Sequence, residues 1–179
     1  MGRRATSLLC IIAMLLCTGY RRSDWGRWQD LDGDCQDTRQ EVLIRFSEVV
    51  PTLDEKGCKV IGGEWVDPYD GKIYTDPKVL DIDHIVPLQE ASVSGGERWD
   101  RWRKEQYFND ERHLLPTHRS HNRSKGARGP GYWKPPDETV WCSYARVWVQ
   151  IKSRWELTAG VVERMNLKAM LDMCKWERV

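Results

Sequence analysis

The chain has 179 residues, of which 40% are hydrophobic and 31% are charged, and its formal net charge is +1. This length suits one domain with a core of its own. The near-zero charge excludes a protein that binds polyanions through its total charge alone.

Residues 1–19 have the pattern of a signal peptide. Arg3 and Arg4 precede an apolar run from Leu8 to Cys17, as in secretory leaders. The run is too short to cross a bilayer, so we expect a secreted protein with no membrane association beyond the leader. A buried N-terminal helix is the alternative, and the abrupt change to polar residues 20–24 argues against it.

Four of the six cysteines lie beyond the expected leader. An even number of cysteines in an exported chain favours disulfides. Of the three pairings we favour the local one, in which each disulfide contributes about 3–4 kcal/mol of chain entropy. A structural zinc site is the weaker alternative, because no Cys-x-x-Cys spacing occurs. The favoured pairs are Cys35 with Cys58 and Cys142 with Cys174.

The first half of the chain predicts a mixture of helix and strand. Residues 20–34 are polar and are expected to wrap the domain, 35–179, without regular structure. A helix is predicted from Thr38, which stands at capping-box spacing from Glu41, towards Pro51. Short runs at 59–61, 64–66 and 72–74, separated by turn residues, predict a β-hairpin or meander.

The second half predicts a strand from Leu80 to Val86, a charged helix over 97–107, a short strand over 113–116 and a short helix over 117–125. Asp137 is expected to cap a long helix, and a last helix follows Thr158. The long helix carries an aromatic stripe at helical spacing, which favours a core-facing surface over a base-stacking platform. The predicted fold class is α+β.

All four histidines lie between Leu80 and Lys125. In the same stretch, Asp81 and Asp83 interrupt an apolar run, and burying such groups costs several kcal/mol unless they are paired. A divalent cation is a suitable partner. The order strand, long insertion, short strand, short helix is the order that ββα-metal nucleases need.

The residue types suit phosphodiester hydrolysis. Asp83 and Asn122 offer oxygen ligands, which favour Mg2+, with Mn2+, Ca2+ and Zn2+ as alternatives. His84 is then free to act as a general base near neutral pH. Because Asp83 and His84 would point to opposite faces of a regular strand, we expect a twist or bulge there.

The segment Asp81 to Gly95, Asp-Ile-Asp-His-Ile-Val-Pro-Leu-x-x-Ala-x-x-Ser-Gly, is followed by Asn122-Arg123-Ser124-Lys125-Gly126. With its flanks, Asp32 to Arg39 and Cys142-x-Tyr144-Ala145, it resembles secreted HNH endonuclease family proteins, relatives of the nuclease part of GmrSD-type restriction enzymes. The resemblance covers essentially the whole chain after the leader.

The resemblance implies a ββα-metal (HNH-type) core with flanking helices. It implies that Asp83 and Asn122 bind the metal, that His84 is the general base and that Lys125 contacts the phosphate. A helix cap for Asn122 and a solvated lysine for Lys125 are the alternatives.

Three further residues have expected roles near this site. The family usually has asparagine where this chain has His113, which we include in the catalytic set because it can orient His84, although the change can also reduce activity. Asp81 and Asn109 are expected to brace the site without contacting the metal, and Asp81 can instead pair with an arginine.

The stretch from Arg112 to Pro136 contains basic but no acidic residues. Such a local excess can bind a phosphate backbone, and backbone contacts do not read bases. We therefore expect a nucleic acid substrate, DNA or RNA, with little sequence preference and no obligate protein partner. The expected phosphate-binding residues are Arg119, Arg123 and Arg128.

Two other functions are compatible with the sequence. One is a non-catalytic extracellular module that binds nucleic acid or another polyanion, with His113 marking a decayed HNH site. The other is a small disulfide-stabilised interaction domain whose histidines are structural, which predicts no metal binding.

Overall fold

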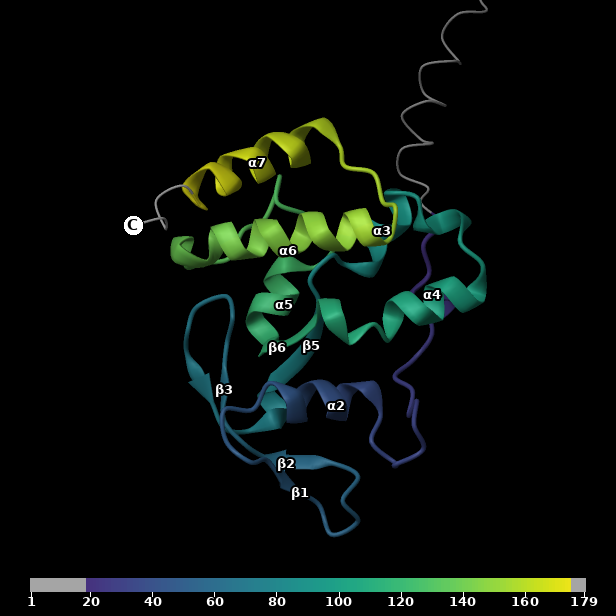
Figure 1. Cartoon of the computed structure of the whole chain (residues 1–179), viewed down its shortest axis with the longest axis vertical. Helices are drawn as coiled ribbons and strands as arrows, with labels where there is room; N and C mark the ends of the chain where they lie inside the picture. The colour runs from purple at the N-terminus through teal and green to yellow at the C-terminus, as the bar shows by residue number, and fades with distance from the viewer. Residues whose placement is uncertain (1–18, 175–179) are drawn as a thin grey trace, which may run out of the picture.

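Figure 1 shows the protein as a computed structural model, which describes residues 19–174. The expected leader therefore lies outside the described residues, except for Gly19. The fold is a mixed α+β arrangement. Its helices are α2 (Thr38–Arg45), α3 (Leu88–Val93), α4 (Arg101–Phe108), α5 (Arg119–Lys125), α6 (Trp141–Arg154) and α7 (Val161–Asp172). Its strands are β1 (Thr52–Leu53), β2 (Val60–Gly62), β3 (Trp65–Val66), β4 (Ile73–Tyr74), β5 (Leu80–His84) and β6 (Leu114–His118). Within residues 19–174, no helix is long and apolar enough to cross a membrane.

The described strands form three separate two-stranded antiparallel sheets. The predicted β-hairpin is confirmed for β3 and β4, which pair with each other, whereas β2 pairs with β1, so the three predicted runs do not form a continuous meander. Gly63 separates the two sheets, and a Cβ atom there would lie 2.6 Å from the Trp65 ring. The turn at Gly63 therefore needs glycine, and it interrupts the pairing that a continuous meander would require.

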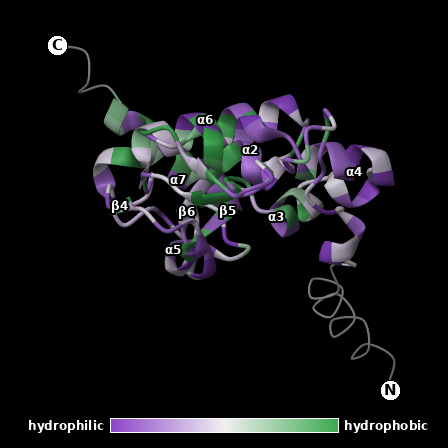
Figure 2. Cartoon of the chain, turned by 90° about the horizontal axis from the view of Figure 1, so that it is seen from below, coloured by the Kyte–Doolittle hydropathy of each residue, from purple (hydrophilic) through white to green (hydrophobic). Residues whose placement is uncertain are grey.

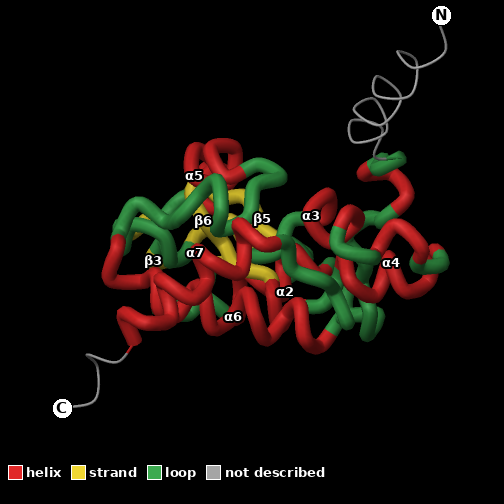
Figure 3. Tube along the Cα trace, turned by 90° about the horizontal axis from the view of Figure 1, so that it is seen from above, coloured by secondary structure: helices red, strands yellow, loops and turns green. Residues whose placement is uncertain are grey.

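The β5–β6 pair is regular over its whole length. Leu80 pairs with His118 at one end and His84 with Leu114 at the other, with no shift of register. The bulge expected near Asp83 is therefore absent. Leu80 and Ile82 pack with α2 in a hydrophobic cluster, while α5 follows β6 directly on the other side of the strands (Figure 3).

The main core lies among α3, α4, α6 and α7 and is rich in aromatic residues. Tyr144 and Trp148 of α6 are buried in it, which confirms the core-facing interpretation of the aromatic stripe. In Figure 2 the ribbon of α6 carries both hydrophobic and hydrophilic residues, whereas the ribbon of α4 is mostly hydrophilic. Residues 20–34 also join this core, because Trp25 is buried in it.

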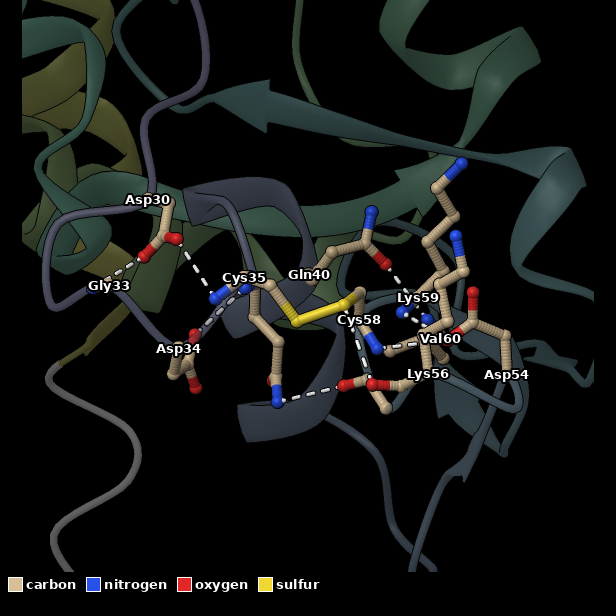
Figure 4. The surroundings of a disulfide bond; sticks show 12 residues. Asp30, Gly33, Asp34, Cys35, Gln40, Asp54, Lys56, Cys58, Lys59 and Val60 are labelled. Carbon is tan, nitrogen blue, oxygen red and sulfur yellow. Dashed lines mark hydrogen bonds between the residues drawn. A yellow bond between two sulfur atoms is a disulfide. The ribbon is translucent and has the colours of Figure 1, made fainter.

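Both expected disulfides are present. Cys35–Cys58 ties the segment before α2 to the turn between β1 and β2 (Figure 4), and Cys142–Cys174 ties the start of α6 to the end of α7. They close loops whose cysteines are 23 and 32 residues apart in the sequence. Loops of this length predict about 3–4 kcal/mol of stabilisation from each disulfide.

The start of α2 differs from the prediction. Asp37, not Thr38, caps the helix, and its side chain accepts a hydrogen bond from the Gln40 amide. Thr38 instead donates from its hydroxyl to the Asn109 side chain at 2.7 Å. The helix ends at Arg45, well before Pro51. A tertiary contact thus replaces the predicted capping box.

Candidate functional site

A cavity of about 440 Å³ runs beside β5. Within residues 19–174, β5 pairs with β6 alone, so no strand pairs with its other edge. Side chains from both faces of a strand can border the space beside a free edge, and all four residues from Asp81 to His84 line the cavity. The free edge thus brings Asp83 and His84 to one site without the expected bulge. Asn122 of α5 lines the same cavity.

Asp83 is buried and held by two partners. The Lys125 ammonium lies 2.6 Å from each carboxylate oxygen, and the Tyr69 hydroxyl donates to Oδ2 at 2.6 Å. Burial and the nearby carboxylate raise the pKa of Tyr69, so its hydroxyl stays protonated. A carboxylate offers about four lone-pair positions, and one remains on Oδ1 for a further partner.

Lys125 is fully buried and also donates to the His84 carbonyl oxygen at 2.8 Å. Burial lowers the pKa of Lys125, and the adjacent Asp83 opposes that shift. Its position differs from the expected one, because the ammonium faces Asp83 and not the open cavity. The structure thus places Lys125 as the residue that fixes Asp83.

Asn122 donates from its side-chain nitrogen to Asp81 Oδ2 at 3.1 Å. A carboxylate oxygen can only accept, so the nitrogen must face Asp81 and the amide oxygen is left as an acceptor. An oxygen donor on α5 beside Asp83 fits a hard divalent cation. Asp81 therefore lies in the site itself and orients the amide, as expected for a bracing residue.

His84 is oriented by its ring nitrogen Nε2, which lies 2.9 Å from the Phe108 carbonyl oxygen. A carbonyl only accepts, so Nε2 carries the proton and Nδ1 keeps the basic lone pair. Trp28 stacks on the imidazole with ring planes 9° apart. Burial lowers the pKa of His84 well below its ordinary value, and His113 and Arg22 lower it further. The imidazole is therefore neutral at physiological pH.

His113 does not line the cavity but lies behind His84, with ring centroids 5.7 Å apart. Its Nε2 donates to the Tyr107 carbonyl at 2.7 Å, and burial lowers its pKa to about 4. This position suits a residue that packs against His84. It does not bring the His113 ring into contact with a substrate in the cavity. The catalytic role of His113 therefore stays a prediction, limited to supporting His84.

Asn109 also lies away from the cavity. Its side chain accepts from the Gln29 amide at 3.1 Å and from Thr38, and it donates to the Arg27 carbonyl. It thus joins the N-terminal segment to α2 and α4, and its bracing of the site stays a prediction.

The three expected phosphate-binding arginines do not line the cavity. Arg119 donates to the carbonyl oxygens of Lys78 and Val79, and Arg128 to that of Lys125. Arg123 is exposed on the surface of α5. The cavity is instead bordered by Arg22 and Arg39, which sequence reasoning missed because both lie far from the motif in the chain.

Sequence reasoning also missed Asp67, which it placed in a simple turn. This buried carboxylate accepts from the Thr117 hydroxyl, from the His118 amide at 2.7 Å and from His121 Nδ1 at 3.0 Å. It therefore anchors the junction between β6 and α5, which positions Asn122. The turn pattern carries no signal for so distant a partner.

In the part of the chain that the structure describes, two other groups of side chains lie close enough together to hold one cation, and neither borders the cavity. In the first, Asp67 is already occupied by the three donors just described. The second is an exposed loop in which Asp30 accepts from the amides of Gly33 and Cys35 (Figure 4). The groups are Asp67, Asp70 and His121, and Asp30, Asp32 and Asp34.

Comparison with known proteins gives one informative relative. An uncharacterized secreted protein of Arthroderma benhamiae is 35% identical over 158 residues, which make up 87% of this chain and 76% of that protein. This chain belongs to the same family. It is a secreted protein, in agreement with its leader-like start and its two disulfides. No family model and no solved structure matches the chain.

Proposed function

We propose that this protein is a secreted metal-dependent endonuclease that hydrolyses phosphodiester bonds in DNA or RNA, with β5, β6 and α5 as an HNH-type ββα-metal core. The observation that carries the proposal is the meeting of Asp83, His84 and Asn122 at one cavity. These residues come from a strand and from a helix about forty positions later, in the order that such a site needs.

The donor set fits a divalent cation. Asn122 keeps its amide oxygen free because Asp81 takes the nitrogen, and Asp83 keeps a lone pair on Oδ1. Mg2+ prefers such oxygen ligands. When bound by Asp83 and Asn122, the ion would neutralise charge on the phosphate and on the leaving oxygen.

His84 is suited to the proton transfer. A general base must be unprotonated and must keep a free lone pair at the site. The bond from Nε2 to Phe108 fixes the tautomer with Nδ1 unprotonated, and the stacked Trp28 restricts rotation of the ring. In the proposed reaction, Nδ1 takes a proton from the attacking water.

Lys125 and Asp81 orient the two side chains that offer oxygen ligands to the metal. Lys125 holds the Asp83 carboxylate in one orientation, and Asp81 does the same for the Asn122 amide. Arg22 and Arg39, which line the cavity, can contact phosphate groups, and these are the same in every sequence. We therefore propose cleavage with little sequence preference.

The first test is a nuclease assay with plasmid DNA and with RNA, in the presence of Mg2+, Mn2+, Ca2+ or Zn2+ and with EDTA. We expect cleavage that EDTA abolishes. His84→Ala should lower the rate at least about a hundredfold, the usual contribution of a general base.

Added imidazole makes this test specific for proton transfer. The truncated side chain leaves space beside the cavity, so imidazole should restore part of the lost activity of His84→Ala and should not accelerate the wild type. An active His84→Ala protein, or a wild type without metal-dependent cleavage, would contradict the proposed mechanism.

One observation favours a second function, a non-catalytic module that binds nucleic acid or another polyanion. The Lys125 ammonium already contacts both Asp83 oxygens, so the carboxylate is neutralised without a metal. This function predicts oligonucleotide binding that EDTA leaves unchanged, and no cleavage with any of the four metals.

A further inference from the structure

The N-terminal segment forms one wall of the cavity. Tyr20, Arg22 and Trp28 all line it, although the sequence predicts only an irregular wrap for residues 20–34. Trp25, between them, is buried in the main core and fixes the path of the segment. In Figure 1 this segment, drawn in purple, passes α4 on its way to α2.

The charges around the cavity differ in how far they are already compensated. Lys125 neutralises Asp83 at 2.6 Å. Arg39 is attracted to Asp81 and is anchored by hydrogen bonds to the carbonyl oxygens of Pro77 and Leu80. Arg22 is exposed, and no carboxylate within residues 19–174 forms an ion pair with it. Arg22 thus keeps its positive charge without a carboxylate partner in the described part of the chain, and it interacts with the Tyr20 hydroxyl beside it.

Arg22 also lies close to the catalytic centre. Its guanidinium is 5.3 Å from the centre of the Phe108 ring. The backbone carbonyl of the same Phe108 orients His84. A guanidinium presents a planar fork of donors that matches two phosphate oxygens. Its neighbour Arg21 differs from Arg22 in charge pairing and in position. Arg21 pairs with Asp24 at 3.2 Å and does not line the cavity.

We propose that the N-terminal segment is part of the substrate site, and that Arg22 binds a phosphate of a nucleic acid strand lying beside β5, with the Tyr20 and Trp28 rings contacting the adjoining nucleotide. The proposal rests on the proposed nuclease function and names the group that binds its substrate. Aromatic rings beside a basic group are the usual pattern for single strands, so the strand is single in the cavity.

The test compares Arg22→Ala with Arg21→Ala, which removes the same charge one residue away. Both are placed in the His84→Ala background, so that binding of a fluorescein-labelled single-stranded oligonucleotide is measured by anisotropy without cleavage. Arg22→Ala should weaken binding about tenfold at low salt, as expected for one charge-assisted contact. Arg21→Ala should leave the affinity unchanged.

Salt dependence separates a phosphate contact from a structural effect. Each lost contact to a single strand reduces the slope of log K against log salt by about 0.7. Arg22→Ala should show this reduction, while Arg22→Lys should keep the slope and lose part of the affinity. Thermal unfolding of both alanine variants should match the parent protein, because both side chains are exposed.

The outcomes separate this inference from the proposed function. If the wild type cleaves nucleic acid and Arg22→Ala has the affinity and salt slope of Arg21→Ala, the assignment of Arg22 is overturned while the nuclease stands. If the wild type binds nucleic acid without cleaving it, and Arg22→Ala still reduces the slope of log K against log salt, the phosphate contact is supported and the nuclease function is overturned. A stronger affinity for duplex than for single-stranded DNA would overturn the single-strand assignment.

Discussion

Individual side chains at the site are held in one chemical state by burial. His84 and His113 are both buried and hydrogen-bonded to backbone carbonyl oxygens through Nε2. Burial disfavours the charged form of an imidazole, and the pKa of each ring is lowered accordingly. The site therefore offers a neutral base, and the folded protein resists protonation there.

The low pKa of His113 predicts acid sensitivity. An unfolded chain protonates this histidine near its ordinary pKa of 6.5, whereas the folded protein does so only at about 4. Between these two values the unfolded state binds more protons, so the free energy of unfolding falls as the pH falls. The expected loss from this residue is about 3 kcal/mol across that window.

Urea unfolding of the wild type and of His113→Asn, measured at pH 7 and pH 4.5, isolates this contribution. His84 adds a loss of the same sign in both proteins. The difference between them therefore reports on His113, including its effect on the pKa of His84. The wild type should lose more stability on acidification than His113→Asn. An equal loss in the two proteins would show that His113 is protonated in the folded state.

At the scale of elements, one buried ion pair fixes α5 on β5. Lys125 and Asp83 are both nearly inaccessible to solvent, and removing one partner of such a pair leaves the other charge buried and unpaired. Lys125→Met should therefore lower the free energy of unfolding by about 3–5 kcal/mol. Urea unfolding measures this loss directly.

Lys168→Met is the matched control, because Lys168 pairs with Asp172 one turn away on α7 and its side chain is 75% exposed. Exposed pairs contribute little, so its stability should stay near that of the wild type. Mg2+ adds a second measurement. If the cation binds Asp83, it should raise the unfolding midpoint of Lys125→Met more than that of the wild type, and equal shifts would argue against a metal at Asp83.

For the whole molecule, the two disulfides join different parts of the domain. Cys142–Cys174 closes α6 onto α7, and no residue of these helices lines the cavity. In the other disulfide, Cys35 lies four residues before Arg39, which lines the cavity.

Replacing each pair of cysteines by serine should therefore have different consequences. Either double variant should lose about 3–4 kcal/mol of stability, measured by urea unfolding. Oligonucleotide binding should stay unchanged without Cys142–Cys174 and should weaken without Cys35–Cys58. The reverse pattern would place the binding surface on α6 and α7.

Much of the fold follows from local sequence patterns. Helical spacing of aromatic residues predicts α6 and its buried face, and the apolar run from Leu80 predicts β5. The four cysteines beyond the expected leader allow three pairings, and the local pairing is the one present. Local patterns give the wrong prediction where a contact between distant residues determines the structure. At Thr38, the hydroxyl donates a hydrogen bond to Asn109 and does not cap the helix.

The sequence by itself determined which chemical groups this protein has between Asp81 and Lys125, because side-chain chemistry and spacing are written in the chain. Only the tertiary structure decided how those groups meet. The free edge of β5 admits residues from both strand faces to one cavity, the buried Lys125 takes the Asp83 carboxylate, and Arg22 arrives from the N-terminal segment. Each of these depends on packing between segments distant in sequence, which no local periodicity encodes.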